Sequence, residues 1–168
     1  ERLGIKRLFC VPEQMAPDGR FPTVQSPNPE NPEGFALAIA LAQKENADLI
    51  IGTDPDADRV GVMARDGREF KVLTGNQTGV LLLDYIINAR LRTKTMPARP
   101  VAVKTIVTTE MARVVAEKNG VELLDTFTGF KFIAEAINAL DDQKRFIFSY
   151  EESYGYLIGS HARDKDAV

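Results

Sequence analysis

The sequence predicts an α/β fold made of two consecutive three-layer α/β units, both truncated, with mixed and mainly parallel sheets. Short apolar runs alternate with helical segments along the chain, which is the order typical of parallel α/β units. A stretch with two prolines, residues 93–100, interrupts this alternation, and the same pattern restarts after it. We therefore expect two domains, residues 1–95 and residues 96–168.

Apolar runs and turn residues set the expected elements of the first domain. Proline supplies no ladder donor and interrupts helices, so the proline-dense residues 11–33 predict an ordered loop. The Asp66-Gly67 pair between two apolar runs is a strong hairpin signal. In chain order the expected elements are a strand over 5–11, a helix over 32–47, a buried strand over 48–53, a hairpin of 60–65 with 69–74, and a helix over 77–91.

The second domain repeats the alternation of strands and helices, and Gly120 closes its first helix. In chain order the expected elements are a strand over 101–107, a helix over 110–119, a strand over 121–127, a helix over 130–140 and a strand over 145–150. Ligands of such folds bind beyond the carboxyl ends of the strands. The polar clusters described next all follow strand ends, which makes them candidates for a functional site.

Composition and charge exclude several classes of protein. The 168 residues carry 21 basic and 24 acidic side chains, and the formal net charge of −3 gives no electrostatic case for binding nucleic acid or an anionic membrane. No apolar run is long enough to span a bilayer. Cys10 is the only cysteine, so no intrachain disulfide can form and a reducing compartment is expected. We therefore expect a soluble, cytoplasmic protein.

Three aspartates follow the buried strand in the string T-D-P-D-A-D-R at residues 53–59. Asp54, Asp56 and Asp58 repel one another unless a cation lies between them, and their alternate spacing lets a turning loop aim all three inward. Carboxylate oxygens are the protein ligands that Mg²⁺ prefers. The string therefore predicts a magnesium loop, in which Arg59 holds a neighbouring phosphate or locks the loop. A solvated acidic turn is the alternative.

Two other motifs share part of this string. An EF-hand beginning at Asp54 requires glycine and glutamate where this chain has Arg59 and Arg65, so it is excluded. The string D-A-D-R-V matches the D-x-D-x-[TV] opening of haloacid dehalogenase-like phosphatases, with Asp56 as nucleophile and Asp58 as acid/base. That alternative leaves Asp54 without a role and expects an insertion or crossover where a hairpin follows.

The longer string T-D-P-D-A-D-R-V-G resembles the metal-binding loop of the α-D-phosphohexomutases, the phosphoglucomutase and phosphomannomutase family. The resemblance implies that Asp54, Asp56 and Asp58 bind Mg²⁺, whose further ligand is the phosphate on a catalytic serine. It also likens residues 1–95 to the family's second domain, truncated at its N-terminus. Residues 96–168 are similar to most of the third domain, truncated at its C-terminus.

The string Y-E-E-S-Y-G at residues 150–155 resembles the sugar-recognition loop of the same family, with Tyr150 in place of the usual glycine. A carboxylate and a hydroxyl two residues apart lie on one side of an extended strand. There they can accept from and donate to neighbouring sugar hydroxyls. The resemblance assigns these roles to Glu151 and Ser153, and an ordinary polar strand end is the alternative.

Three further segments, V-K-T, T-G-F-K-F and R-D-K-D, resemble parts of the family's substrate site. A lysine in an apolar strand, such as Lys104, is costly unless its ammonium reaches an anion or solvent. A glycine before a helix offers backbone N–H groups to a phosphate. Helix capping and solvated charge are the alternatives for these segments. The resemblance implies the following substrate-binding residues besides the sugar loop: Arg59, Lys104, Thr128, Gly129, Lys131 and Lys165.

The resemblance implies a mutase reaction, in which a phosphoserine phosphorylates the sugar, a bisphosphate forms, and the other phosphate returns to the serine. We expect a hexose phosphate, with glucose favoured over mannose, and a pentose phosphate as a further alternative. The family's strings T-A-S-H-N-P and R-x-S-G-T do not occur in this sequence. No catalytic residue is therefore assigned here, and Lys131 is only an auxiliary candidate.

We accordingly expect the chain to need the remaining domains of a longer polypeptide and to be inactive alone. The alternative from a different functional class is a sugar-phosphate-binding module without catalysis. The sole histidine, His161, matches no motif of the family, and a solvated loop position is expected for it.

Overall fold

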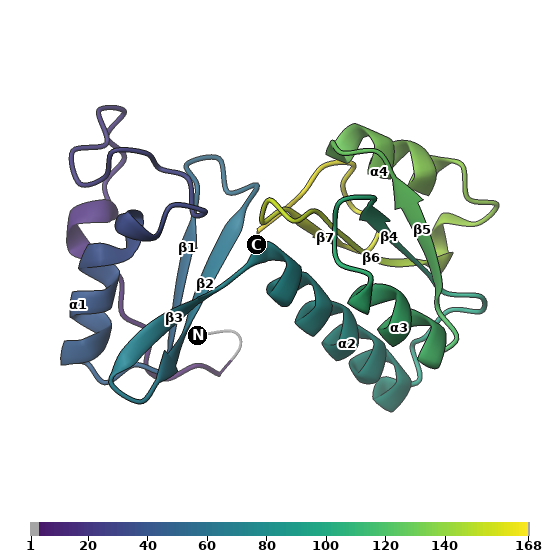
Figure 1. The fold of residues 1–168 in the computed structure, drawn as a ribbon, viewed down its shortest axis with the longest axis horizontal. Coiled ribbons are helices and arrows are strands. Elements are labelled where there is room, and N and C mark those ends of the chain that lie inside the picture. The colour runs from purple at the N-terminus through teal and green to yellow at the C-terminus, as the bar shows by residue number, and fades with distance from the viewer. Residues whose placement is uncertain (1–3, 168) are drawn as a thin grey trace.

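In the computed structural model, which describes residues 4–167, the chain forms two units that lie side by side (Figure 1). The first unit contains α1 (Ala36–Lys44), β1 (Leu49–Thr53), β2 (Val60–Asp66) and β3 (Glu69–Leu73). The second contains α2 (Gly75–Thr93), β4 (Val101–Thr105), α3 (Met111–Lys118), β5 (Glu122–Thr126), α4 (Phe130–Asn138), β6 (Phe146–Tyr150) and β7 (Tyr156–Ile158). Short 3-10 turns lie at Pro12–Gln14, Pro32–Phe35 and Gln143–Arg145. The predicted α/β class is confirmed.

The first unit is an antiparallel sheet with α1 on one face (Figure 1). Its strand order is β1-β2-β3, and the predicted hairpin joins β2 to β3 through Gly67, whose φ of 64° suits glycine. Parallel neighbours need a crossover of a dozen or more residues, whereas these strands are joined by short loops. The described strands of this unit therefore differ from the mainly parallel arrangement that the sequence predicted.

The strand predicted over residues 5–11 does not form, which is a correction. The backbone of this segment joins no ladder, and Leu8 is 72% exposed. Its contact with the first unit includes the Arg7 side chain, which donates to the carbonyl of Glu45. A strand needs a neighbour to satisfy its backbone groups, and an apolar composition cannot supply one. The loop predicted over residues 11–33 is present, apart from its short 3-10 turns.

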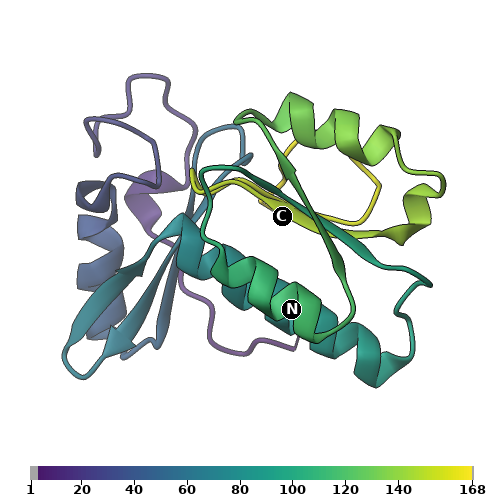
Figure 2. The same ribbon diagram turned by 45° about the vertical axis from the view of Figure 1, so that its right-hand side comes forward.

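The second unit contains the mixed, mainly parallel sheet that the sequence predicted. Its strand order is β5-β4-β6-β7, with β4 parallel to both β5 and β6, and β7 antiparallel to β6. The helices α2 and α3 lie on one face of this sheet, and α4 lies on the other (Figures 1 and 2). The unit is therefore three layers thick. The short strand β7 had no signal in the sequence prediction, because its three residues are too few to show a period.

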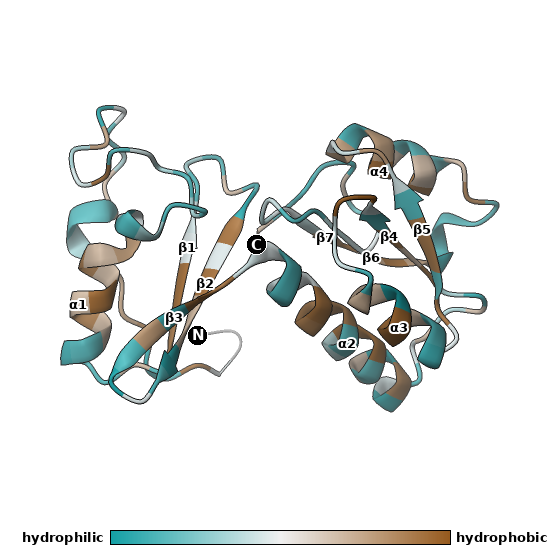
Figure 3. Ribbon diagram, viewed as in Figure 1, coloured by the Kyte–Doolittle hydropathy of each residue, from teal (hydrophilic) through white to brown (hydrophobic). Residues whose placement is uncertain are grey.

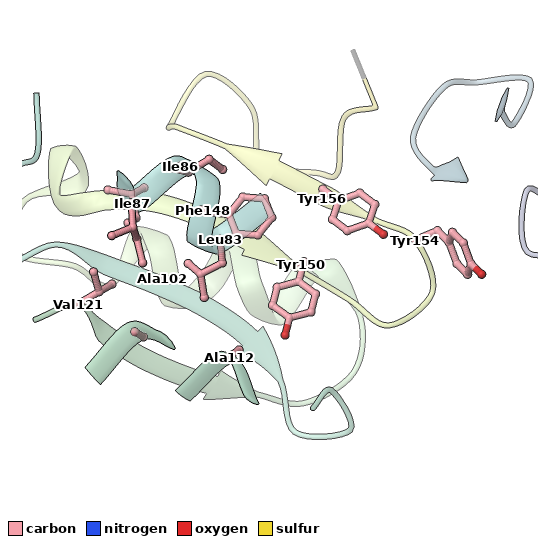
Figure 4. Close-up of a cluster of buried hydrophobic side chains, with 12 residues drawn as sticks. Leu83, Ile86, Ile87, Ala102, Ala112, Val121, Phe148, Tyr150, Tyr154 and Tyr156 are labelled. Carbon is pink, nitrogen blue, oxygen red and sulfur yellow. The ribbon is translucent and has the colours of Figure 1, made fainter. Parts of the chain in front are cut away.

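Each face of the second sheet has its own apolar core. Leu83 and Ile87 of α2 pack with Ala102 of β4 and Phe148 of β6 on one face (Figure 4). The cluster on the other face joins α4 to β4, β6 and β7 through Val101, Val103, Phe130, Ile133, Ile137, Phe146 and Leu157. Alternate residues of β4 thus serve opposite cores, as the two-residue period of a strand requires. The sheet is buried on both faces.

The helix α2 belongs to the second unit by packing. Its residues Leu83 and Ile87 are fully buried against the second sheet and α3. The division between the units therefore falls between β3 and α2, and not after residue 95 as the sequence predicted. Residues 94–100 connect α2 to β4 inside one unit, and prolines mark such a connection as readily as a domain boundary.

Thr74 begins α2 with a capping box. Its hydroxyl accepts from the backbone N–H of Gln77, and the Gln77 side chain accepts from the Thr74 backbone N–H. Figure 3 shows apolar residues concentrated in the strands of both sheets and on parts of the helices. Within residues 4–167, no helix is long and apolar enough to cross a membrane.

Candidate metal-binding and substrate site

The three aspartates lie in a tight turn between β1 and β2, at the junction of the two units. The turn begins with a hydrogen bond from the Ala57 N–H to the Asp54 carbonyl, and Ala57 adopts a left-handed φ of 55°. The buried carboxylate of Asp54 organises the rest. Its Oδ1 accepts from the backbone N–H groups of Asp58 and Arg59, both at 3.1 Å, and its Oδ2 accepts from Arg59 Nε at 2.7 Å.

The turn brings all three carboxylates together. One oxygen from each of Asp54, Asp56 and Asp58 lies within 4.8 Å of the others, although the first is buried and the second is exposed. Asp58 Oδ1 is buried and has no hydrogen-bond partner among the described residues. An orphaned acceptor next to two further carboxylates suits a hard divalent cation, and the exposure of Asp56 leaves room for water or phosphate. The residues therefore fit a magnesium ion.

The surroundings of the loop shift the pKa values of Asp54 and Asp58 in opposite directions. Burial opposes ionisation of Asp54, but hydrogen bonds from Asp58 and Arg59 outweigh it and lower the pKa of Asp54. Burial and the neighbouring Asp54 raise the pKa of Asp58, although Lys165 opposes this. Two carboxyl groups held this close favour sharing a proton or a cation over both standing ionised alone.

Arg59 locks the loop from within. Its guanidinium pairs with Asp54 at 2.7 Å, and its nitrogens lie 3.5 Å from carboxylate oxygens of Asp58 and of Glu30. These anions, with Asp54 first, raise the pKa of Arg59. Of the two roles predicted for Arg59, this geometry fits the one that locks the loop.

The second unit holds the same loop from the other side. The Val60 N–H donates to the Tyr154 carbonyl at 3.1 Å, and Arg59 forms an antiparallel bridge with Gly155. Farther along, the Ala57 carbonyl accepts from the Ala167 N–H at 3.0 Å. The loop and the Y-E-E-S-Y-G string thus share backbone hydrogen bonds, although they lie far apart in the sequence.

The Y-E-E-S-Y-G string forms the loop between β6 and β7. The Glu151 N–H donates to the Gly155 carbonyl at 2.9 Å and closes the loop, while Tyr154 adopts a left-handed φ of 69°. Glu151 is buried, and its Oε1 accepts from the Gly129 N–H at 2.9 Å. Burial raises the pKa of Glu151, and the Gly129 hydrogen bond acts against it. Ser153 is half-buried in the same loop.

The predicted lysines occupy three different environments. Lys165 reaches the aspartate loop, with Nζ 2.9 Å from Asp58 Oδ2. Lys104 is fully buried at the end of β4, 2.9 Å from both Glu110 and Asp125. Lys131 is exposed, with its ammonium 4.8 Å from the centre of the Phe132 ring. The structure therefore brings only Lys165 of the three to the aspartates.

The T-G-F-K segment contributes through its backbone. Thr128 is exposed, and the N-cap residue of α4 is Gly129, with no side-chain hydrogen bond at that cap. Gly129 has a φ of 112°, a value that L side chains rarely adopt, and its N–H points at Glu151. His161 is exposed on the loop after β7, 3.1 Å from Asp166.

Sequence reasoning missed the contacts that fix the Y-E-E-S-Y-G loop. Glu152 accepts from the Thr105 hydroxyl at 3.0 Å, which ties the loop to the end of β4. A Cβ at Gly75 would collide with the Glu152 carbonyl, and a Cβ at Gly79 would collide with the Tyr150 ring. The two glycines in the string L-T-G-N-Q-T-G were the available signal, because glycine inside a helix usually has a packing reason.

Comparison with known families agrees with this geometry. Residues 1–67 match the model of the phosphoglucomutase/phosphomannomutase alpha/beta/alpha domain II, and residues 74–168 match that of domain III. The gap between these matches, residues 68–73, lies just before α2. The two matches together cover most of the chain.

Individual relatives give the same result. A phosphoglucomutase of Staphylococcus aureus is 44% identical over 171 residues, which cover 100% of this chain and 30% of the relative. A solved parafusin (phosphoglucomutase) from Paramecium is 28% identical, with a TM-score of 0.54 over 71% of this chain and 19% of that one. A family protein from Burkholderia thailandensis shares the fold at 19% identity, with a TM-score of 0.68 over 89% of this chain and 30% of that one. The chain thus spans under a third of these relatives.

Proposed function

Because the chain belongs to the phosphoglucomutase/phosphomannomutase family, we propose that it is the central part of an α-D-phosphohexomutase, which interconverts hexose 1-phosphate and hexose 6-phosphate, with glucose favoured. The observation that carries the proposal is the junction of the two units. There the aspartate loop and the sugar loop are joined by the Val60–Tyr154 hydrogen bond and the Arg59–Gly155 bridge. Backbone hydrogen bonds thus fix the proposed metal site and the proposed sugar site next to each other. This arrangement suits phosphoryl transfer, which depends on positioning and charge stabilisation.

The aspartate loop is the proposed magnesium site. Asp54, Asp56 and Asp58 would hold the ion, and Arg59 keeps Asp54 in place through the bond at 2.7 Å. The ion, when bound, neutralises the charge that develops on the transferring phosphoryl group. Asp56 is the most exposed of the three, so a phosphate that arrives from solvent can reach an ion held there.

The loop between β6 and β7 is the proposed sugar site. The Gly129 N–H holds the Glu151 carboxylate, which would accept from sugar hydroxyls, and the half-buried Ser153 is the proposed donor. Of the predicted phosphate contacts, Lys165 is the one that reaches the aspartate loop, whereas the Gly129 N–H already donates to Glu151. Lys104, whose ammonium is neutralised by two carboxylates, and Thr128 and Lys131, which lie at the surface, retain substrate roles only as predictions.

The catalytic phosphoserine is proposed to come from another part of a longer polypeptide. The relatives are more than three times as long as this chain, and the family's serine string does not occur here. We therefore propose that residues 1–168 alone do not turn over glucose 1-phosphate. The single cysteine, Cys10, favours a reducing compartment, so we propose the cytoplasm.

The haloacid dehalogenase alternative gains no support. In the described residues β1 is followed by the antiparallel strand β2, where the phosphatase alternative expects an insertion or crossover. The two family models that match, over residues 1–67 and 74–168, are both mutase domains. The other alternative is a sugar-phosphate-binding module without catalysis. The activity assay below distinguishes it from a mutase.

The test is magnesium-dependent conversion of glucose 1-phosphate to glucose 6-phosphate by the full-length protein. Asp56→Asn should lower kcat by about a hundredfold or more, since it removes a charged ligand of the proposed magnesium ion that would neutralise the transferring phosphoryl group. Asp66→Asn, at the opposite end of β2, is the matched control and should leave the rate unchanged. Release of inorganic phosphate in place of glucose 6-phosphate, or full activity of Asp56→Asn, would contradict the proposal.

A further inference from the structure

Lys165 lies between the two candidate loops. Its ammonium is 2.9 Å from Asp58 Oδ2 and 3.6 Å from Asp164 Oδ1, and its side chain is 20% exposed. Asp58 supplies the partner on the metal loop, whereas Asp164 is a largely exposed neighbour in the chain. The Lys165 side chain is therefore the one cationic contact from the second unit to the three aspartates, among the ion pairs of residues 4–167.

The stem of Lys165 is fixed by the sugar loop. A Cβ at Gly155 would collide with Lys165 Cδ, so the stem lies directly on the backbone of the Y-E-E-S-Y-G string. Its ammonium is also 5.9 Å from the centre of the Phe130 ring, at the start of α4. Burial acts to lower the pKa of Lys165, but the neighbouring carboxylates, Asp58 first, outweigh it and raise the pKa. The Lys165 side chain thus joins the aspartate loop to the backbone of the Y-E-E-S-Y-G string.

The carboxylate that Lys165 contacts is a proposed magnesium ligand. Of its two oxygens, Oδ2 is paired with Lys165, while Oδ1 is the buried oxygen without a hydrogen-bond partner in the part of the chain that the structure describes. A divalent cation at the three aspartates and the ammonium of Lys165 would both lie against Asp58. Like charges this close repel one another strongly where water is partly excluded.

We propose that Lys165 and the divalent cation compete for the Asp58 carboxylate, so that Lys165 couples metal binding to capture of the sugar phosphate. This inference rests on the proposed function. Cation binding weakens the Lys165–Asp58 pair and frees the ammonium for an anionic ligand at the sugar loop. By linkage, an anionic ligand that takes Lys165 strengthens cation binding by the same factor. Lys165 is therefore a positioning residue as well as a substrate contact.

The experiment measures Mn²⁺ binding to the full-length protein by electron paramagnetic resonance, without any sugar phosphate. Lys165→Met keeps the aliphatic stem on Gly155 and removes the charge, so it should bind Mn²⁺ roughly two- to fivefold more tightly, which corresponds to an ion pair of up to about 1 kcal/mol. Lys165→Arg keeps the charge and should behave as the unaltered protein. Lys71→Met is the matched control, because it removes the lysine of another lysine–aspartate pair, with Asp66, away from the loop. Its Mn²⁺ affinity should not change.

A second readout tests the coupling. Glucose 1-phosphate should tighten Mn²⁺ binding more in the unaltered protein than in Lys165→Met, because that variant lacks the residue that transmits the effect. Unchanged or weaker Mn²⁺ binding by Lys165→Met would overturn the inference. If Mn²⁺ binds the unaltered protein and is lost in Asp56→Asn, the proposed metal site stands even when the Lys165 result fails. If the unaltered protein binds no Mn²⁺, both fall.

Discussion

The two units of this chain bury their sheets to different extents. In the second unit, helices cover both faces of the sheet, and each face has its own core. In the first unit, α1 covers one face over a core of Phe35, Ala42, Ile50 and Met63, while Ile51, the middle residue of β1, is 62% exposed. The candidate metal loop nevertheless projects from the thinner unit. Its geometry therefore depends on contacts that its own core does not provide.

Those contacts come from Arg59 within the loop and from the second unit across the junction. Tyr154, Lys165 and Ala167 each hold a different part of the loop. A loop held at both sides can keep three mutually repelling carboxylates together more easily than one held by its flanking strands alone. The thicker unit therefore supplies contacts that hold the candidate metal loop of the thinner unit.

The largest expected effect is a difference between two matched isoleucines. Ile87 in α2 is fully buried in the core that α2 and α3 form with the second sheet. Ile50 in β1 lies in the smaller core of the first unit, whose sheet is covered by a helix on one face only. Ile87→Ala should lower the free energy of unfolding by about 4 kcal/mol, and Ile50→Ala by about 2 kcal/mol. Urea denaturation followed by circular dichroism measures both.

The corresponding valine variants are the controls, and each should cost about 1 kcal/mol or less because the cavity is only one methyl group. Equal losses for the two alanine variants would break the comparison, since they would show that the first unit is as well packed at Ile50 as the second is at Ile87.

A smaller effect is expected at Lys104, which has no counterpart in the first unit among the described lysines. Its ammonium pairs with Glu110 and Asp125 and donates to the carbonyls of Thr105 and Thr108. Lys104→Met should lower the free energy of unfolding by about 2 kcal/mol, because it removes all four contacts of a buried ammonium, although Arg113 still pairs with both carboxylates. The exposed Lys131→Met should cost almost nothing.

Kinetics of the full-length protein distinguish a structural role of Lys104 from a role in substrate binding. A structural Lys104 predicts that the stability falls while KM for glucose 1-phosphate stays close to its original value. If Lys104→Met instead raises KM tenfold and leaves the unfolding midpoint unchanged, then Lys104 contacts the substrate, as the family resemblance implied, and the ion-pair network is not its main role.

Local patterns in the sequence were sufficient for several features. The hairpin at Asp66-Gly67 and the aspartate turn depend on residues a few positions apart, and the structure has both. The α/β class followed from the alternation of elements. Each of these is decided by nearby residues, so one sequence contains the information.

Features that depend on residues far apart in the sequence could not be predicted from the sequence alone. The apolar residues 5–11 suggested a strand, but no neighbouring strand pairs with them in the described structure. The helix over residues 75–93 has apolar residues that could serve either sheet, and only packing assigned it to the second. Lys104 and Lys165 looked alike as lysines in family-like strings, yet one pairs with Glu110 and Asp125 and the other with Asp58.

The smallest expected effect lies at the junction, where Glu151 belongs to the thicker unit but faces the site. Burial raises the pKa of Glu151 in the folded state above its value in the unfolded chain. By linkage, the contribution of Glu151 to stability is fully present below the unfolded pKa of about 4.3 and is lost as pH rises through the folded pKa.

Glu151→Gln cannot ionise and can still accept from the Gly129 N–H. The variant should therefore match the unaltered protein near pH 3 and become more stable by less than about 1 kcal/mol at neutral pH. Urea denaturation across this pH range measures the difference. If the variant instead becomes less stable than the unaltered protein as pH rises, a cation such as Lys165, and not burial, dominates at Glu151.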